Sequence, residues 1–451
     1  MKIHFLSSSL RTNSGFSIVT KNLALELRKL GHDITMSGLQ TANFAEFSYG
    51  IETLPTITHY VDDLTQFMIN VQTIKPDVVI YIHQMDSGQF NAFTKVFLKT
   101  FVYCPVETRG IPDQMRGDLL SVIMNGGKVV AQTQYGQGEI QLALGGIDIP
   151  FIYHGFNDKI FKPLNLGDVD QIRYCYYGTD SGKAESDPVK LHKQGCYGCI
   201  LSGNDTTKCM YYRDEHVSIL KFIDGKWTGK DIPITELPNI TKGKFVFGFL
   251  GYNLGIRKRM ERLLKAYSLF IKDSRQLKDR TVLHMHTIPI AIDGLNLIRI
   301  VQDLGIQDNV IFSYGSFRSA AWTNEGINIL YNTFDTNISA SSGEGFGLAT
   351  IESLACGIPN IGPNSTSFTE LIGEDPKTRR GLLASIIDWQ MIPDGCYRSL
   401  VDEQDLSQCM RIMYQDEKLR KQCSKNAIEW TKQFNWTSIC QQWDKLLKEI
   451  K

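Results

Sequence analysis

Residues 343–352 read GEGFGLATIE and stand directly between an apolar, β-prone run, DTNISASS, and a small-residue stretch, SLACGIPNI. A strand, a glycine-rich turn and a helix in this order predict one unit of a parallel α/β sheet. The glycines permit positive φ angles and expose backbone N–H groups, so the turn is suited to hold phosphate oxygens where the helix begins. These glycines are Gly343, Gly345 and Gly347.

Two glutamates frame this turn, with Glu344 in the loop and Glu352 inside the first turns of the helix. Carboxylates that touched a diphosphate would repel it, so their natural partners are the hydroxyl groups of a sugar or a ribose on either side of it. The spacing therefore suits a ligand made of a sugar, a diphosphate and a ribose. The alternative is structural, with one glutamate capping the helix and the other solvated.

The alternation of β-branched runs and amphipathic stretches extends outward from this turn over most of the chain. One series begins at KIHFLSS near the N-terminus, and a second begins at Lys244 with KFVFGFLG. Each series is typical of a doubly wound parallel sheet, so we expect two Rossmann-like α/β domains that face a cleft. The predicted boundaries are 1–165 for the first domain, completed by a C-terminal helix at about 430–451, then 166–243 for an inserted module and 244–429 for the second domain.

Bulk composition fits a globular protein of this kind. The 451 residues exceed one ordinary core, and 48 basic against 48 acidic residues leave no overall field to attract nucleic acid or anionic lipid. The opening MKIHFLSSS lacks the features of a signal peptide, and the longest apolar runs have the length of strands. These features predict a cytoplasmic protein without a transmembrane segment.

Two further stretches follow strands at the edge where such folds bind ligands. In SSSLRTNSGFS, Gly15 lets the backbone approach a ligand before a helix starts, although an ordinary strand-to-helix turn would look the same. GYNLGIRKRMERLL supplies Arg257, Lys258 and Arg259 as cations for a diphosphate. A solvated basic helix start is the alternative for these three residues, but their place on the same edge as GEGFGL favours a binding site.

The segment SSGEGFGLATIESLACGIPNIG resembles the signature of the retaining GT-B glycosyltransferases that use nucleotide-sugar donors, the large family with an E-x7-E motif. Further stretches similar to that family follow in the expected order. They include SGFSIVTKNLALELRKLGHDI, IKPDVVIYIH, VVAQTQYGQGEIQLALGG, IPFIYHGFNDKIFKP and RKRMERLLKAYSLF. The resemblance covers most of the chain outside the insertion and implies the GT-B fold.

The resemblance also implies roles for residues. Glu344 would bind the hydroxyls of the donor sugar, Glu352 the hydroxyls of the ribose, and Lys258 with a neighbouring arginine the leaving diphosphate. Backbone N–H groups for the sugar and diphosphate would come from Gly345, Phe346, Gly347 and Leu348. Such enzymes are thought to retain the anomeric configuration by a front-face reaction, for which no catalytic metal is expected.

The chain departs from the family pattern in two places. Members commonly carry an arginine where this chain has GYNLG, so Arg257 or Arg259 must substitute for it. Many also carry a histidine at the end of a first-domain strand that touches the donor sugar. Here His83 ends VVIYIH and is the candidate, with a purely structural histidine as the alternative, whereas YCPVET offers Glu107, which could serve the acceptor.

The inserted module is rich in cysteine. Its thiols are Cys175, Cys196, Cys199 and Cys209, and the middle pair forms a C-x2-C knuckle. A small polar module without an evident core needs a stabilising cross-link, so one hypothesis is a structural zinc site. The other is four unlinked thiols in a variable loop, because the spacing between the pairs is irregular.

These observations favour a retaining glycosyltransferase that moves a hexose from a nucleoside diphosphate sugar to a hydroxyl acceptor. The acceptor stays open among glycans, lipid-linked sugars, proteins and modified nucleic acid bases. The alternative is a non-catalytic nucleotide-sugar or glycan-binding protein whose insertion binds a partner. A Rossmann dehydrogenase is excluded by the first strand, since no G-x-G-x-x-G follows LSSSLRTNSG.

Overall fold

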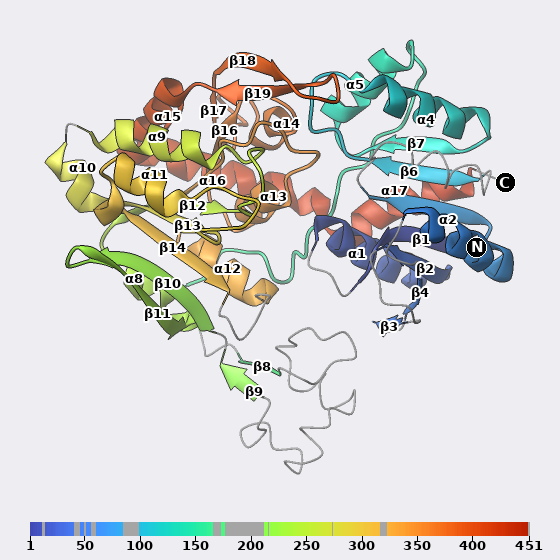
Figure 1. Ribbon diagram of the computed structural model, residues 1–451, viewed down its shortest axis with the longest axis horizontal. Helices are drawn as coiled ribbons and strands as arrows, with labels where there is room; N and C mark the ends of the chain where they lie inside the picture. Colours follow the sequence, from blue (N-terminus) through green and yellow to red (C-terminus); the bar gives the residue numbers. More distant parts are fainter. Residues whose placement is uncertain are drawn as a thin grey trace.

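Two α/β domains stand side by side in the computed structural model of this chain (Figure 1). The structure describes residues 1–10, 14–39, 46–48, 51–55, 60–83, 99–165, 173–175, 212–214, 216–272, 274–315 and 323–449. Each domain is built on its own sheet, in which parallel strands predominate. The predicted pair of Rossmann-like domains is therefore confirmed.

The first sheet has seven strands, all parallel except for the edge strand β3. In spatial order they are β3 (Glu46–Ser48), β4 (Ile51–Pro55), β2 (Asp33–Leu39), β1 (Lys2–Ser8), β5 (Val78–Ile82), β6 (Thr100–Cys104) and β7 (Lys128–Ala131). The helices of this domain are α1 (Gly15–Lys29), α2 (Tyr60–Ile74), α4 (Asp113–Met124) and α5 (Gln134–Ala143).

The second sheet has eight strands. In spatial order they are β11 (Lys226–Pro233), β10 (His216–Ile223), β14 (Val310–Gly315), β13 (Thr281–His286), β12 (Phe245–Leu250), β15 (Thr336–Ile338), β16 (Asn360–Pro363) and β17 (Gly381–Ala384). Its helices are α8 (Leu237–Ile240), α9 (Met260–Ile271), α10 (Arg275–Arg280), α11 (Leu297–Asp303), α12 (Asn324–Asn332), α13 (Leu348–Ala355), α14 (Phe368–Ile372), α15 (Glu403–Gln415) and α16 (Glu417–Thr431). The single-turn helices η3 (Ile234–Glu236) and η4 (Gln307–Asn309) complete it.

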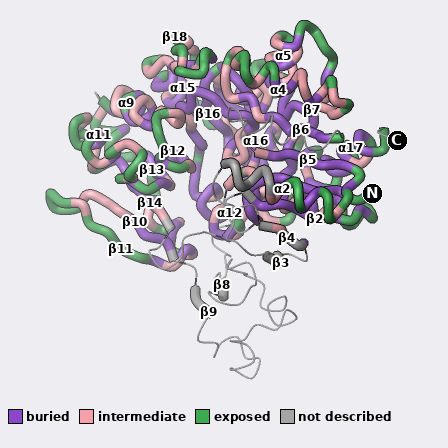
Figure 2. Tube along the Cα trace, turned by 45° about the vertical axis from the view of Figure 1, so that its right-hand side comes forward, coloured by how far each residue is buried: buried purple, intermediate pink, exposed green. Residues whose placement is uncertain are grey.

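The strands at the centre of both sheets are buried on both faces because helices cover them (Figure 2). This burial explains why runs such as VVIYI in β5 and TFVYC in β6 are continuously apolar and do not alternate. The β-prone run before GEGFGL forms a shorter strand than its composition suggests, since only Thr336–Ile338 pair with neighbours.

The hairpin of β10 and β11 changes the predicted extent of the insertion. These strands lie within the predicted module at 166–243, yet β10 pairs antiparallel with β14 and extends the second sheet. Asp224 and Gly225 form the turn with φ angles of 50° and 78°, as a type I′ hairpin requires. Upstream, β8 (Arg173–Cys175) pairs with β9 (Tyr212–Asp214) in a separate two-stranded sheet.

Two of the described segments cross between the domains, and these crossings run side by side. Phe156 donates its backbone N–H to Phe434 in the single-turn helix η5 (Lys432–Phe434) at 2.9 Å. Beyond this point α17 (Trp436–Lys448) returns to the first domain and packs on α1 (Figure 1). Trp443 of α17 is fully buried and stands edge-on to Tyr103 of β6, with ring centroids 5.0 Å apart.

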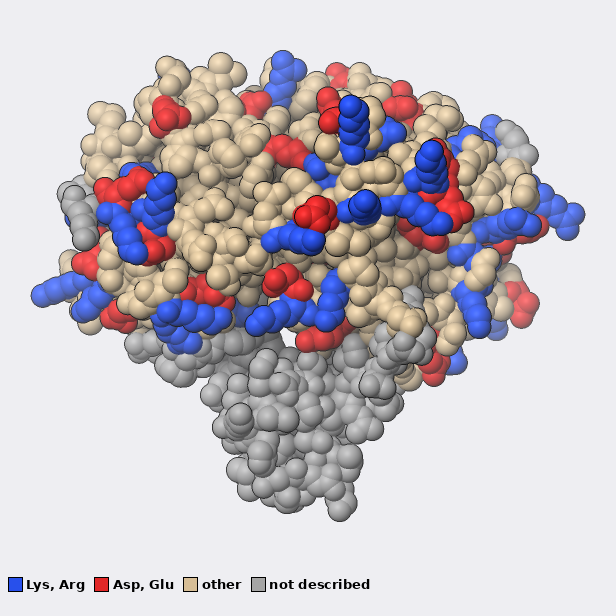
Figure 3. Space-filling model, turned by 180° about the vertical axis from the view of Figure 1, so that it is seen from behind, with Lys and Arg blue, Asp and Glu red and all other residues tan. Residues whose placement is uncertain are grey.

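Within the described ranges, no helix is both long enough and apolar enough to cross a bilayer. On the face seen from behind, lysine and arginine side chains alternate with aspartate and glutamate (Figure 3). Positive and negative side chains are therefore interspersed over the described residues of this face.

Candidate functional site

In each sheet the chain first adds strands on one side of the initial parallel strand and later adds strands on its other side. Each sheet therefore has a point at which the direction of strand addition reverses. In the first sheet this point lies between β1 and β5, and in the second it lies between β12 and β15. Ligands of open α/β sheets bind outside the carboxyl ends of the strands at such points. The segments that follow these four strands carry most of the predicted site residues: Gly15, His83, Arg257, Lys258 and Glu344.

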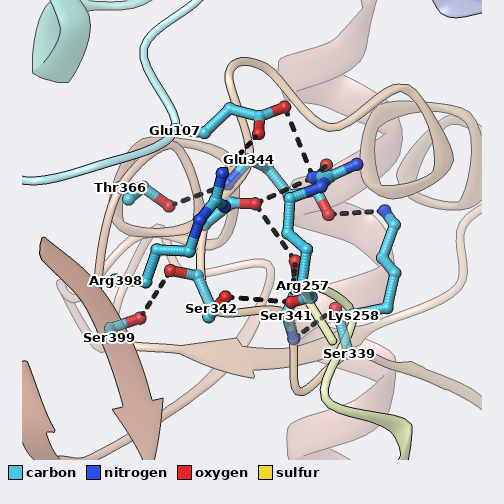
Figure 4. A network of polar contacts seen from close by, with 11 residues as sticks. Glu107, Arg257, Lys258, Ser339, Ser341, Ser342, Glu344, Thr366, Arg398 and Ser399 are labelled. Atoms are coloured by element: carbon cyan, nitrogen blue, oxygen red, sulfur yellow. Dashed lines mark hydrogen bonds and ion pairs between the residues drawn. The ribbon is translucent and has the colours of Figure 1, made fainter. Parts of the chain in front are cut away.

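Glu344 is 9% exposed, and its carboxylate holds two cations (Figure 4). Oε1 accepts a hydrogen bond from Lys258 Nζ at 2.5 Å, and Oε2 accepts one from Arg257 Nη1 at 3.0 Å. Burial acts to raise the pKa of this carboxyl, but the charges of Lys258 and Arg257 outweigh it and lower the pKa to about 2. Glu344 is thus an ionised carboxylate at neutral pH.

The three consecutive basic residues after β12 have side chains with different hydrogen-bond partners. Arg257 Nη1 also donates to the carbonyl oxygen of Gly343 at 2.9 Å, which keeps its guanidinium over the glycine loop. Arg259 adopts a left-handed φ of 47° at the N-cap of α9, and its Nη2 donates to Gln390 Oε1 at 2.6 Å. Gln390 lies on β18 (Ile386–Met391), outside this cluster. Of the two arginines that the sequence left open, the structure therefore brings Arg257 to Glu344.

Hydrogen bonds lock the loop after β12 to the loop after β15. Ser342 donates both its backbone N–H and its hydroxyl to the carbonyl oxygen of Arg257, at 2.8 and 3.0 Å. Thr366 accepts from the backbone N–H of Glu344 at 3.3 Å. Ser399 of β19 (Tyr397–Val401) donates its backbone N–H to the carbonyl oxygen of Ser342 at 3.1 Å. The acidic and basic residues therefore sit on one cross-linked scaffold.

The glycines of GEGFGL are needed for two different reasons. Only Gly347 has a positive φ, 103°, at the N-cap of α13, where the predicted turn requires it. The other two glycines lie against the first domain. A Cβ on Gly343 would lie 1.7 Å from the carbonyl oxygen of Glu107, and one on Gly345 would lie 2.8 Å from Pro105 Cβ. Close approach between domains, which no local pattern reveals, requires these two glycines.

Phe346 and Leu348 point toward the first domain. The Phe346 ring is buried against His154, with centroids 4.7 Å apart, and His154 Nδ1 lies 2.8 Å from the hydroxyl of Tyr103. Burial lowers the pKa of His154 to about 3, so this imidazole is neutral and belongs to the interface.

Glu352 lies within α13 and is half-buried. Its Oε2 accepts a hydrogen bond from the hydroxyl of Tyr331 on α12 at 3.2 Å. Burial raises the pKa of Glu352 to about 8, and the hydrogen bond from Tyr331 opposes that rise. The two glutamates of the motif thus differ sharply: Glu344 is neutralised by cations, whereas Glu352 has a neutral hydroxyl as its partner.

The first domain brings a second helix N-terminus to the site. A Cβ on Gly15, at the start of α1, would lie 3.6 Å from Leu348 Cδ1 at the start of α13, so the two helix starts face each other. His83 follows β5 and packs on Phe16 of α1, with ring centroids 5.0 Å apart. Both predicted first-domain residues therefore lie at the edge that faces the glycine loop.

Glu107, the residue predicted to serve the acceptor, pairs with two arginines of the second domain. Its Oε1 lies 3.4 Å from Arg257 Nη1, and its Oε2 lies 3.4 Å from Arg398 Nη2 on β19. Arg398 was missed from the sequence because nothing in its local pattern marks it. The pairing instead joins positions that are 291 residues apart.

The zinc hypothesis lies mostly outside the described residues. Cys175 belongs to β8, while Cys196, Cys199 and Cys209 fall in a stretch that the structure does not describe. Over the part of the chain that is described, no group of three or more histidine, cysteine, aspartate or glutamate side chains could hold a metal ion. The hypothesis therefore finds no support here.

Comparison with known proteins connects this geometry to a family. The profile described as "Glycosyl transferases group 1" matches residues 236–430, which include Lys258, Glu344 and Glu352. Residues 236–430 thus resemble the group 1 glycosyltransferases. The predicted recognition of this family is therefore confirmed, and the match covers the second domain and part of the predicted insertion.

Two relatives of this chain come from Escherichia coli. The serotype-specific mannosyltransferase WbdA is 25% identical over 182 residues, which are 40% of this chain and 19% of WbdA. The O-antigen chain mannosyltransferase B is 26% identical over 191 residues, 38% of this chain and 45% of the relative. The chain thus spans less than half the length of either relative.

Solved structures share the fold of this chain over its whole length. Sucrose-phosphate synthase from Thermosynechococcus elongatus superposes with a TM-score of 0.65 at 14% identity, covering 100% of this chain and 99% of the synthase. Anabaena HepE in complex with UDP-glucose superposes with a TM-score of 0.62 at 15% identity, and the match covers 100% of both chains. The predicted GT-B fold is confirmed.

Proposed function

We propose that this protein transfers a hexose from a nucleoside diphosphate sugar to a hydroxyl acceptor with retention of anomeric configuration. The observation that carries the proposal is the Glu344 cluster, in which a buried carboxylate sits between Lys258 and Arg257 at the start of a glycine-bounded helix. Cations and a helix N-terminus form a site suited to a diphosphate.

In this proposal each residue has one task. Glu344 accepts hydrogen bonds from the hydroxyls of the donor sugar, Glu352 accepts them from the ribose, and Lys258 with Arg257 binds the diphosphate. The bond between C1 of the sugar and the phosphate oxygen breaks, and its electron pair leaves on the diphosphate. The acceptor oxygen bonds to C1 on the same face, and its proton passes to the departing phosphate. Preorganised cations at the leaving group stabilise the charge that develops there.

His83 and Gly15 serve the same donor from the first domain. Gly15 begins α1 opposite Leu348, so its backbone can approach the bound donor. His83 packs on Phe16 at the same helix start, and in this proposal its imidazole contacts the transferred sugar.

The names of the comparison proteins suggest which donors to test first. Two relatives are mannosyltransferases, and HepE was solved with UDP-glucose. GDP-mannose and UDP-glucose are therefore the first two donors, and a thermal-shift screen should find which one binds. A ligand at 100 times its dissociation constant stabilises the folded protein by about 2.7 kcal/mol.

The decisive variant is Lys258→Ala, assayed with the donor that the screen identifies. Loss of one preorganised charge at the leaving group should reduce donor turnover by about 10²- to 10³-fold. Lys265→Ala, an exposed lysine of α9 that pairs with Glu403 instead, is the matched control and should keep full turnover. Equal turnover in Lys258→Ala and the wild type would refute the assignment. Donor binding without any product, across glycan, lipid-linked, protein and nucleic acid acceptors, would favour a non-catalytic binding protein.

A further inference from the structure

Glu107 links the two domains through the cations of the candidate donor site. It follows β6 in the first domain, yet its carboxylate lies between Arg257 and Arg398 of the second domain, 3.4 Å from each guanidinium (Figure 4). Arg257 is thereby held from two sides, since its Nη1 also donates to Glu344 at 3.0 Å. The Arg257 guanidinium therefore contacts one carboxylate from each domain.

The position of Glu107 depends on contact between the domains. Arg109 and Tyr397 exchange two backbone hydrogen bonds of 2.9 Å, so β19 pairs with the loop that carries Glu107. On its other side β19 holds the glycine loop, through the bond from Ser399 to Ser342. Glu107 can reach Arg257 only while these loops stay in contact.

The surroundings of Glu107 disfavour a role as general base. Each of its two carboxylate oxygens already has a cationic partner within 4 Å. The residue is better suited to orient a cation than to carry a proton.

We propose that Glu107 and Arg398 form a positioning pair that holds Arg257 toward the donor diphosphate when the domains are closed. This inference rests on the proposed function and deepens it. Neither residue need touch the donor. Their effect passes through Arg257, whose orientation matters most where charge develops on the leaving phosphate.

This arrangement predicts an unusual kinetic pattern for Glu107→Gln. The amide keeps the size of the side chain but removes a negative charge close to the diphosphate, so binding of UDP or GDP should stay unchanged or become tighter. Arg257 loses one of its three partners, which are Gly343, Glu344 and Glu107, so kcat should fall about tenfold while KM for the donor changes less than threefold. A role confined to holding the domains together would instead raise KM, because fewer molecules would be closed.

Glu370→Gln provides the matched control. Glu370 is also an interdomain carboxylate, and it accepts from the backbone N–H groups of Gln134 and Tyr135 at the start of α5 and from the hydroxyl of Tyr153. It makes no contact with Arg257 among the described interactions. Its loss should raise KM for the donor and leave kcat unchanged.

The experiment measures donor turnover and the calorimetric binding of UDP and GDP for the wild type, Glu107→Gln, Arg398→Gln, the double variant and Glu370→Gln. We expect the first two variants to share the loss of kcat and the double variant to be no worse than either one. A rise in KM without a fall in kcat in Glu107→Gln, or additive losses in the double variant, would overturn the positioning pair. A wild type that binds neither nucleotide and turns over neither GDP-mannose nor UDP-glucose would overturn the proposed function, and this inference with it.

Discussion

Glu352 is the residue at which binding and stability oppose each other most clearly. Its pKa is raised to about 8 by burial, so the folded protein holds a proton that the unfolded chain has released by neutral pH. Folding stability therefore falls as the pH rises from the ordinary glutamate value near 4.5 toward 8. Glu352→Gln should raise the free energy of unfolding by about 1 kcal/mol at pH 8.5 and by less at pH 6, as measured by urea unfolding at both values.

Under the proposed function the same substitution should weaken UDP binding, because an amide would replace the carboxylate that we assign to the ribose hydroxyls. UDP binding to the wild type should tighten as the pH rises toward 8 and release a proton, which calorimetry in buffers of different ionisation enthalpy detects. A Gln variant that is less stable than the wild type at pH 8.5 would contradict the raised pKa.

At the residue scale, the sequence predicts which residues come together at the site better than it predicts the contacts that each of them makes. Glu344 and Lys258 follow from the motif and from the edge of the sheet on which each one lies. The choice between Arg257 and Arg259 does not follow, because it depends on the left-handed backbone at Arg259, which sends that side chain to Gln390. Arg398 is invisible to local reasoning because its partner lies in the other domain.

At the scale of elements, the loop between β15 and α13 is shaped by the domain that faces it. A Cβ on Gly343 would meet the carbonyl oxygen of Glu107 at 1.7 Å, and backbone atoms cannot yield as a flexible side chain can. Gly343→Ala should lower the free energy of unfolding by about 1 to 3 kcal/mol and reduce donor turnover at least tenfold, measured by urea unfolding and a product assay.

Gly117→Ala is the control for this loop. Gly117 lies inside α4 with open space around it, so alanine should stabilise that helix by about 0.5 to 1 kcal/mol and leave turnover unchanged. Gly343→Ala with wild-type turnover would show that the loops separate without consequence for the site.

The elements themselves are largely readable from the sequence, with one instructive exception. Buried parallel strands such as β5 give long apolar runs, and α9 gives a clear apolar face, so both are predicted. The hairpin of β10 and β11 was placed in the insertion because β11 is an edge strand with mostly exposed, polar residues. The Asp224–Gly225 turn was the available signal for a hairpin, but its pairing with β14 depends on tertiary structure.

At the scale of the whole molecule, the chain builds its first domain from both of its ends. The sequence suggests this arrangement through the apolar residues of the last helix, and the structure packs α17 on α1 and under β6. The two crossings lie together, because a Cβ on Gly155 would meet the ring of Trp436 at 2.6 Å. Motion between the domains is therefore expected to pivot where both crossings pass.

Trp443→Ala tests whether the C-terminal helix is a structural part of the first domain. Trp443 is fully buried against Phe101 and Tyr103, so truncation should lower the free energy of unfolding by about 3 to 5 kcal/mol. Trp443→Phe keeps an aromatic ring and should lose less. Hydrogen exchange should show faster exchange in α1 and β6, on which α17 packs, while β12 and β13 keep wild-type protection. Faster exchange in β12 and β13 instead, with α1 unchanged, would mean that α17 stabilises the second domain and that the first domain folds without it.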